Sequence, residues 1–387
     1  MNKKQQKRIF AVPGKSLLII ASVAIAIGCN KQHGEPHALK NFKQVNLVAN
    51  TAEYHPVTVD PTLLNGFGIA WSPNGVAWVN SVGGHVSELY SSEGATVRKP
   101  VNIPSPIDTI GGLPTGIVFS GGKGFKLGSG EATFIFAGFD GVISAWNPAS
   151  GNNAKKIIGF AGAAYTGLAI GANKGKNFIY AANFSGKRID VWDTAFRRIP
   201  MLFADQNMPN DYSPYNIQAV GDLLYVMYAQ LSNEGGTIGH VAGAGKGFVS
   251  VFNTDGSFVK RFASRGSLNI PWGITSAPSN FFEKNDIKTS GESSNNKGYG
   301  DSGDESNELK QSLILVGNFG DGRINVYNVD GKFLGQLQSD NNTISIEGLW
   351  ALSFAPSTAT SIDPNRLYFS AGPDNEADGL FGYLIKL

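Results

Sequence analysis

Oxygen-bearing side chains recur where short apolar runs of this chain begin or end, and together they could hold a hard cation. The candidate ligands are Glu347, Asn183, Asn216, Asn318 and Asp374. Calcium takes about six to eight oxygen ligands and accepts both carboxylates and side-chain amides. The alternative is that Asn and Asp beside Gly only form turns and cap strand ends with their own side chains. The residue types leave both interpretations open.

A second group of side chains could bind a sugar or another flat ligand. Large aromatic residues open four of the repeated apolar segments described below: Tyr165, Tyr215, Trp272 and Trp350. Together with Asn80 they are the predicted ligand-binding residues at the mouth of a channel. Aromatic residues in a crowded repeat can equally pack between neighbouring units, and this is the alternative interpretation.

Other catalytic patterns do not occur in the sequence. His55, His85 and His240 lie far apart and show no metal-ligand spacing, and no Gly-x-Ser-x-Gly nucleophile elbow is present. The segment from Gly243 to Gly247 imitates a phosphate loop, but it runs into an apolar strand-like segment instead of a helix. It is therefore interpreted as a turn.

The elements that must position these residues follow a repeat. Four segments share the order of apolar strand, Gly turn, apolar strand and polar turn: 77–94, 134–151, 180–196 and 313–331. Alternating apolar runs joined by Gly-containing turns are typical of β-hairpins. With 49 Gly and 42% hydrophobic residues, the composition favours an all-β protein with many turns and a large core.

A shorter apolar segment, usually containing Gly, precedes each copy of the repeat. Aligned on one position, the six segments are marked by Gly68, Gly116, Gly167, Asn216, Gly273 and Ala351. A period near 50 residues with about four short strands per unit is typical of a β-propeller. The sequence thus predicts a six-bladed β-propeller with these segments as innermost strands, where a missing side chain relieves crowding around the axis.

The ends of the predicted propeller, 42–387, and two insertions complete the architecture. The last blade has no fourth strand of its own, and the alternating segment 42–48 has no blade, so we expect this N-terminal strand to pair into the C-terminal blade near Tyr383 and close the ring. Residues 279–311 are rich in Ser, Asn, Gly and acids, which predicts a disordered insertion. A second insertion, 230–247, falls within the fourth blade.

The first residues indicate export. Residues 1–28 combine a basic start with an apolar run too short to span a bilayer comfortably, and are interpreted as a lipoprotein signal peptide. Ala26-Ile27-Gly28-Cys29 resembles a bacterial lipobox, so Cys29, the only cysteine, is the predicted lipidation site, with 29–41 as a flexible tether. The predicted location is the cell envelope, at the outer membrane, periplasm or cell surface. A cleaved secretory signal is the alternative.

The charge balance argues against nucleic acid as a partner. The formal charge of +2 includes five basic residues of the predicted signal peptide, and without them 27 basic residues stand against 30 acidic ones. A slightly acidic mature chain lacks the basic surface that nucleic-acid binding requires.

Two family resemblances bear on the fold. The segments PWGITSAP and NFGDGRINVYNVDGKFL resemble NHL repeats, which implies a six-bladed propeller. Motifs such as NLVAN, LPTGIVF and the ending YFSAGPDNEADGLFGYL resemble a conserved hypothetical family of secreted bacterial β-propeller proteins with no assigned activity. That resemblance covers almost the whole mature chain and implies a fold and an exported location.

A third resemblance bears on chemistry. Glu347-Gly348-Leu349-Trp350 resembles the Glu-Gly-Pro-x-Trp opening of gluconolactonase-like propellers, although the Pro is absent and the spacing is one residue short. The resemblance implies a divalent metal at Glu347 that polarises a lactone or ester carbonyl and activates water.

Three functions therefore stay open at this point. The first is an exported, lipid-anchored propeller that binds a small ligand or a protein partner at its channel face. The second is a calcium-dependent lactonase or esterase centred on Glu347, and the third is a structural envelope protein.

Overall fold

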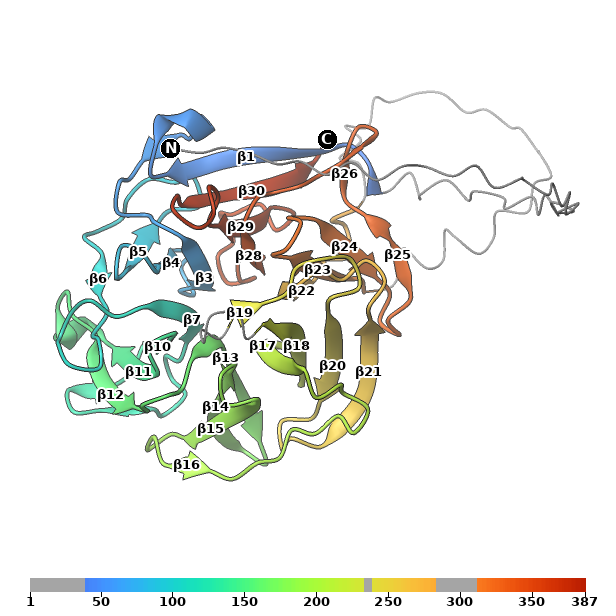
Figure 1. Cartoon of the computed structure of the whole chain (residues 1–387). Coiled ribbons are helices and arrows are strands. Elements are labelled where there is room, and N and C mark those ends of the chain that lie inside the picture. The colour runs from blue at the N-terminus through green and yellow to red at the C-terminus, as the bar shows by residue number, and fades with distance from the viewer. Residues whose placement is uncertain (1–38, 233–238, 283–311) are drawn as a thin grey trace, which may run out of the picture. The chain divides into compact units, whose positions relative to one another are not determined.

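The computed structural model describes residues 39–232, 239–282 and 312–387, and it shows six mainly antiparallel sheets around a common axis (Figure 1). All of them belong to one unit, Glu35–Leu387. The predicted six-bladed β-propeller is confirmed. Cys29 and the predicted signal peptide lie outside the described residues, as does most of the predicted acidic insertion.

Each sheet follows the expected order from the axis outward. The first contains β3 (Gly66–Trp71), β4 (Ala77–Ser81), β5 (Val86–Tyr90) and β6 (Val101–Asn102). The second contains β7 (Pro114–Phe119), β10 (Phe134–Gly138), β11 (Val142–Trp146) and β12 (Lys155–Gly159). The third contains β13 (Tyr165–Asn173), β14 (Lys176–Asn183), β15 (Arg188–Asp193) and β16 (Arg198–Ile199).

The remaining sheets repeat this order with additions. The fourth contains β17 (Tyr212–Val220), β18 (Leu223–Ser232), β20 (Phe248–Phe252) and β21 (Phe258–Ser264), with the short β19 (Gly239–His240) paired to β18. The fifth contains β22 (Pro271–Ser276), β23 (Ile314–Asn318), β24 (Ile324–Tyr327) and β25 (Phe333–Gln336). The sixth contains β28 (Leu349–Ser353), β29 (Leu367–Ala371), β30 (Leu380–Lys386), β1 (Phe42–Ala49) and β2 (Thr58–Val59).

Short elements occupy the connections between these strands. They are β8 (Lys126–Leu127), β9 (Gly130–Glu131), β26 (Gln338–Ser339), β27 (Asn342–Thr343) and the 3-10 helices η2 (Ala52–Tyr54) and η3 (Pro148–Ser150). Within the described ranges, no helix has the length and apolar character needed to cross a bilayer.

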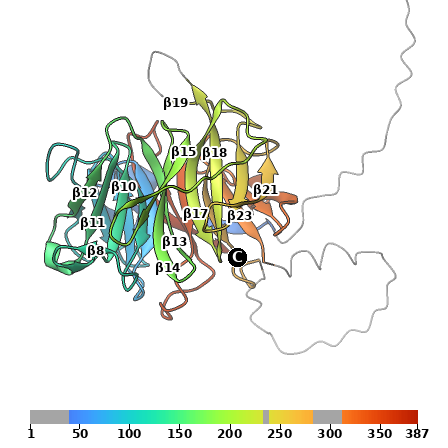
Figure 2. The same ribbon diagram turned by 90° about the horizontal axis from the view of Figure 1, so that it is seen from below.

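The innermost strands form a ring. Each of β3, β7, β13, β17, β22 and β28 contacts the innermost strand of the next sheet, and β28 contacts β3. The edge-on view shows the sheets standing side by side (Figure 2). Residues distant in sequence therefore come together along the axis.

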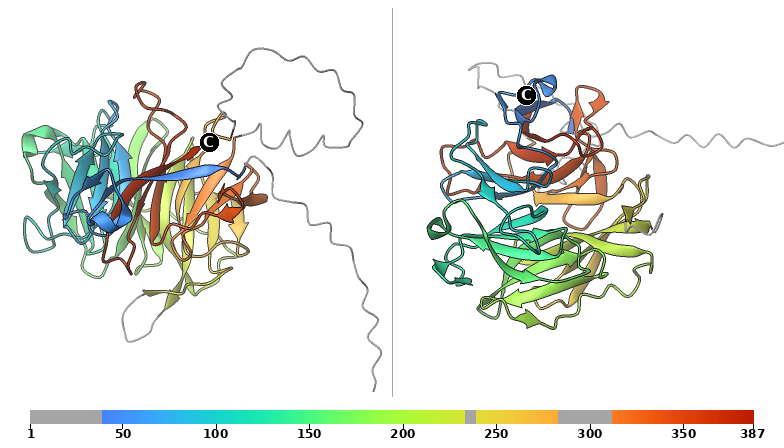
Figure 3. Two further views of the ribbon diagram at one scale, coloured as in Figure 1. Left: turned by 90° about the horizontal axis from the view of Figure 1, so that it is seen from above. Right: turned by 60° about the vertical axis from the view of Figure 1, so that its left-hand side comes forward.

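The N-terminal strand β1 is hydrogen-bonded antiparallel to the C-terminal strand β30. The pairing runs from Phe42 opposite Lys386 to Ala49 opposite Leu380, with Val45 opposite Tyr383. The two strands, blue and dark red, lie side by side in two different directions of view (Figures 1 and 3).

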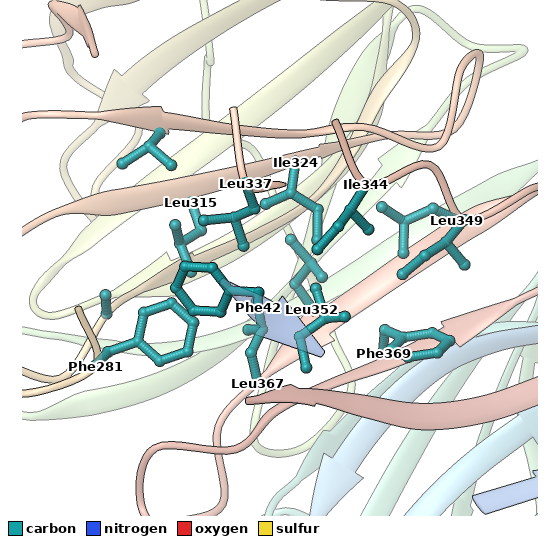
Figure 4. Close-up of a cluster of buried hydrophobic side chains, with 14 of the residues drawn as sticks. Phe42, Phe281, Leu315, Ile324, Leu337, Ile344, Leu349, Leu352, Leu367 and Phe369 are labelled. Carbon is teal, nitrogen blue, oxygen red and sulfur yellow. The ribbon is translucent and has the colours of Figure 1, made fainter. Parts of the chain in front are cut away.

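An apolar cluster between the fifth and sixth sheets anchors the chain start. Phe42 points into it beside Phe281 and Leu337 (Figure 4). Leu39, predicted to lie in the flexible tether, is buried in the same cluster. Phe281 and Phe282, predicted to open the disordered insertion, also pack there against Phe42. The predicted end of the tether and the predicted start of the insertion were therefore wrong by a few residues, because apolar side chains at the ends of both segments are buried in the core.

Glycine allows the inner strands to approach each other closely. A Cβ atom at Gly116 would lie 2.5 Å from the backbone nitrogen of Leu168, and one at Gly273 would lie 2.6 Å from the carbonyl oxygen of Trp350. Real Cβ contacts are not this short. The predicted role of these glycines at the axis therefore agrees with the packing, and a channel cavity of about 180 Å³ remains beside them.

Candidate functional site

A second cavity, of about 210 Å³, lies at the end of the channel where the innermost strands begin. We call it the mouth cavity. It is lined by Asn65, Phe67, Val82, Leu113, Thr115, Phe139, Thr166, Phe184, Tyr215, Gly239, His240, Trp350 and Glu376. These residues come from two kinds of segment, the starts of innermost strands and the turns between the second and third strands of a sheet.

One repeat position supplies most of the wall. The residue just before the aligned Gly position is Phe67, Thr115, Thr166, Tyr215, Trp272 and Trp350 in the six sheets. Five of the six line the mouth cavity. Trp272 lines the neighbouring channel cavity instead. Because successive side chains of a strand point to opposite faces, sharing one position gives these residues a common direction toward the axis.

Aromatic contacts fix the rings at this position. Trp350 is stacked between two rings: its centroid lies 3.8 Å from that of Phe67 and 4.0 Å from that of Phe319. The Trp350 indole nitrogen donates a hydrogen bond to Asn65 Oδ1 at 2.8 Å. Tyr215 meets the ring of Phe184 edge-on at 4.9 Å. Interlocked rings of this kind have little freedom to move, so the apolar wall is preformed.

Two polar pairs complete the mouth cavity. The Tyr215 hydroxyl lies 3.0 Å from His240 Nδ1, and Asn65 Nδ2 donates to Glu376 Oε2 at 2.8 Å. Burial lowers the pKa of His240. This favours a neutral imidazole that accepts a hydrogen bond from the Tyr215 hydroxyl. Burial, with a smaller effect from the Glu376 charge, raises the pKa of Tyr215 well above its ordinary value. Tyr215 is therefore a hydrogen-bond donor here, not an anion.

Glu376 is exposed as a residue, but its carboxyl group lies at the wall of the mouth cavity beside buried Asn65. Burial raises the pKa of this carboxyl group, against the lowering effect of the hydrogen bond from Asn65. Glu376 lies in the turn between β29 and β30, where its backbone has a positive φ of 70°. The turn thus directs one acidic group toward the aromatic wall.

The predicted ligand-binding residues divide into two groups. Tyr215 and Trp350 line the mouth cavity, and Trp272 lies next to it in the channel. Tyr165 does not line it: it is fully buried between the second and third sheets, edge-on to Trp192 at 5.7 Å. Tyr165 stands one residue earlier than Tyr215 in the repeat, so its side chain points to the other face of its strand.

Asn80 also lies away from the mouth cavity. It is buried, and its amide nitrogen donates to the carbonyl oxygens of Thr115 and Gly116 at 3.2 and 3.3 Å. These bonds join the first sheet to the second. The contacts of Asn80 are therefore those of a packing residue.

The amides among the candidate metal ligands make hydrogen bonds within the protein. Asn216 Nδ2 donates to the Trp272 carbonyl at 2.7 Å while Oδ1 accepts from the Ile217 backbone. Asn183 Oδ1 accepts from the Gly186 backbone at 2.9 Å, and its Nδ2 donates to Asp190. The amide oxygens are already occupied by turn and strand contacts, as the turn-former interpretation expects.

The same holds for the remaining members of the set. Asn318 Oδ1 accepts from Asn269 and Asn325, and its Nδ2 donates to Asp321. Glu347 and Asp374 are exposed on turns. Among the described residues, no group of three or more His, Cys, Asp and Glu side chains could hold a metal ion. The amide oxygens of the set proposed for calcium already accept hydrogen bonds within the protein.

Sequence reasoning missed several residues of the mouth cavity. Phe67 and Thr166 occupy the same repeat position as Tyr215, so the alignment of the innermost segments identifies this position as a usable signal. Phe139 and Phe184 each follow the second strand of their sheet directly, which was a second usable signal. His240 has no metal-ligand spacing in the sequence, and its partner in the structure is instead the Tyr215 hydroxyl.

Comparisons with known proteins place the chain among viral relatives, although no protein-family model matches it. Uncharacterized protein R648 of Acanthamoeba polyphaga mimivirus is 29% identical over 372 residues, covering 91% of this chain and 82% of the relative. Uncharacterized protein L690 of the same virus is 31% identical over 368 residues, covering 91% of this chain and 88% of the relative. The resemblance to secreted bacterial proteins stays a prediction beside these relatives.

Solved structures show only distant similarity. A streptogramin B lyase structure has a TM-score of 0.48 at 13% identity, covering 89% of this chain and 97% of that chain. A gluconolactonase from Xanthomonas campestris has a TM-score of 0.44 at 13% identity, covering 83% and 86%. Neither likeness says anything about the chemistry of this chain. With 31% identity over nine tenths of its length, the chain belongs to the protein family that includes mimivirus protein L690.

Proposed function

We propose that this protein binds a small organic ligand in the mouth cavity. The observation that carries the proposal is a concave site in which several aromatic rings surround two polar pairs, Tyr215 with His240 and Asn65 with Glu376. Ligand sites typically combine apolar walls with a few well-placed polar groups. A small ligand suits such a cavity better than a protein partner, which would need a wide surface.

The alternative of a calcium-dependent lactonase or esterase has less support. Its proposed metal ligand, Glu347, is exposed on a turn outside the mouth cavity. The amides of Asn183, Asn216 and Asn318 are engaged within the sheets. A structural envelope role needs no cavity, so it leaves the arrangement at the channel mouth unexplained.

Blocking the mouth cavity tests the binding proposal. Val82 lines the cavity, and Val82→Trp would fill it with a larger side chain. We expect wild-type protein to bind the neutral probe 4-fluorobenzyl alcohol, and Val82→Trp to weaken that binding by about tenfold or more because each lost apolar contact group costs about 1 kcal/mol. Fluorine NMR titration of the probe measures both affinities.

A matched substitution separates blocking from a general effect of the added tryptophan. Val97 is 49% exposed in the β5–β6 connection, at the opposite end of the sheets from the mouth cavity. Val97→Trp should bind the probe as wild type does. The proposal fails if Val82→Trp binds the probe equally well, or if wild-type protein binds neither this neutral probe nor a cationic one of similar size.

A second part of the proposal concerns where the protein is located in the cell. We infer from the signal-like residues 1–28 and from Cys29 that the protein is exported and held at a membrane of the cell envelope by a lipid on that cysteine. Stable anchoring by acyl chains depends on their covalent attachment. In detergent phase separation of expressing bacterial cells, wild-type protein should enter the detergent phase and Cys29→Ser should move to the aqueous phase. A Cys29→Ser variant that stays in the detergent phase contradicts the anchor.

A further inference from the structure

The charge of the mouth cavity has one sign. Among the described residues that line it, Glu376 is the only acidic one, and no Lys or Arg is present. His240 is the only other titratable group with a basic form, and burial lowers its pKa. A bound anion would therefore find no counter-charge on the described wall, whereas a bound cation would find a carboxylate.

Hydrogen-bond donors of the wall are largely used within the protein. The Tyr215 hydroxyl is paired with His240 Nδ1, and the Trp350 indole nitrogen donates to Asn65. Thr115 Oγ1 donates toward the carbonyl oxygens of Ala137 and Tyr165. By contrast, only Oε2 of the Glu376 carboxylate receives a side-chain hydrogen bond from the described residues, from Asn65. The wall offers acceptors more readily than donors.

Aromatic rings supply the rest of the recognition surface. Phe67, Phe139, Phe184, Tyr215 and Trp350 all line the mouth cavity. Phe67 and Phe319 cover the two faces of Trp350, so a ligand meets the faces of the other rings and only the edge of this one. The face of an aromatic ring carries partial negative charge and attracts an ammonium group, most strongly where water is excluded. Rings around a single carboxylate, with no competing Lys or Arg in the described wall, form a site suited to an organic cation.

We propose that the ligand of the mouth cavity is an organic cation, an ammonium group carried on a small apolar body, with Glu376 as its counter-ion. This inference rests on the proposed function and narrows it to one ligand class. The aromatic wall contacts the alkyl groups of the ammonium, and the carboxylate of Glu376 balances its charge. Anionic ligands such as organic acids are rejected, because they would meet Glu376 without a compensating cation.

Two probes of nearly equal shape test the charge preference. Choline carries a trimethylammonium group, and 3,3-dimethyl-1-butanol carries a neutral tert-butyl group in its place. Each has nine equivalent methyl protons, so ligand-observed proton NMR titration reads both in the same way. We expect wild-type protein to bind choline about tenfold more tightly, a difference typical of one cation–π contact together with one charge partner.

Substitution of the carboxylate tests its assigned role. Glu376→Gln keeps an oxygen that can accept a hydrogen bond from Asn65 but removes the negative charge. The variant should bind choline more weakly, so that its affinities for the two probes lie within about twofold of each other. Glu131→Gln is the matched control, because Glu131 is an exposed residue of β9 in the connection at the other end of the sheets. This control should keep the tenfold preference.

The outcomes separate this inference from the binding proposal. Equal affinity for both probes in wild-type protein, or tighter binding of the alcohol, overturns the cation assignment while leaving a ligand site. A choline preference that survives in Glu376→Gln also overturns it. If neither probe binds while 4-fluorobenzyl alcohol does, the cation assignment fails alone. If none of the three binds, the proposed function fails with it.

Discussion

Gly116→Ala is expected to lower the free energy of unfolding by about 3 kcal/mol, near the upper end of the usual effect of forcing extra atoms into a packed interior. The new Cβ would lie 2.5 Å from the Leu168 backbone nitrogen and 2.6 Å from Leu168 Cβ. Both atoms belong to β13, the innermost strand of the next sheet, which cannot move without disturbing its own neighbour in the ring. Equilibrium denaturation in urea measures the loss.

Gly159→Ala provides the control for this change. Gly159 also lies in a strand, β12, but no atom comes within 4 Å of the position its Cβ would take. Its stability should stay within about 0.5 kcal/mol of wild type. If Gly116→Ala were as stable as Gly159→Ala, close approach of the innermost strands would not be what requires glycine at the axis.

The number of sheets could be predicted from the sequence because the repeat is marked by residues with a physical role. Glycine recurs where one innermost strand touches the next, and this contact occurs once per sheet. Of the two sheets without glycine at this position, the fourth follows the same rule. Asn216 stands in the glycine position, and its side chain fills the space left by the missing Cβ of Gly167, with Nδ2 bonded to the Trp272 carbonyl. An apparent metal ligand is thus an inter-sheet contact.

Some residues of the mouth cavity could be predicted from the same repeat, and others could not. Tyr215 and Trp350 follow from the repeat because each directly precedes the aligned position of its innermost strand. Tyr165 was misassigned because a shift of one residue in a strand reverses the direction of a side chain. His240 and Glu376 come from turns of unequal length, and their places depend on β19 pairing with β18 and on the positive φ of Glu376. Neither feature leaves a periodic signal.

Glu88→Gln is expected to stabilise the protein at pH 8 by about 3 kcal/mol. Glu88 lies in β5 and is 1% exposed. One carboxyl oxygen is 2.6 Å from Thr62 Oγ1, and the other is buried with no hydrogen-bond partner. Burial, opposed by the Thr62 hydrogen bond and assisted by the nearby charge of Asp60, raises the pKa of Glu88 to about 7.

Hydrogen-bond geometry independently indicates a protonated Glu88. Thr62 Oγ1 lies within hydrogen-bond distance of Glu88 and also of Asp60 Oδ1, at 2.7 Å, yet a hydroxyl group has one proton. Asp60 also accepts from the Thr62 backbone and from the Tyr90 hydroxyl, so the Thr62 hydroxyl proton joins two other donors when it points to Asp60. Glu88 then carries a proton and donates to Thr62, which donates to Asp60. A glutamine amide at position 88 can make the same donation.

The sign of the pH dependence follows from the raised pKa. In the unfolded chain Glu88 ionises near pH 4.3, so the folded state holds an extra proton between about pH 4 and pH 7. The stability contributed by that proton is complete below about pH 4 and is lost as the pH rises through 7. Glu88→Gln should therefore match wild type near pH 4 and exceed it increasingly up to pH 8, in urea denaturation series across this range. Glu131→Gln removes an exposed carboxylate and should show no such divergence. Parallel curves for Glu88→Gln and wild type would mean that Glu88 is ionised in the folded protein, with a partner for its second oxygen.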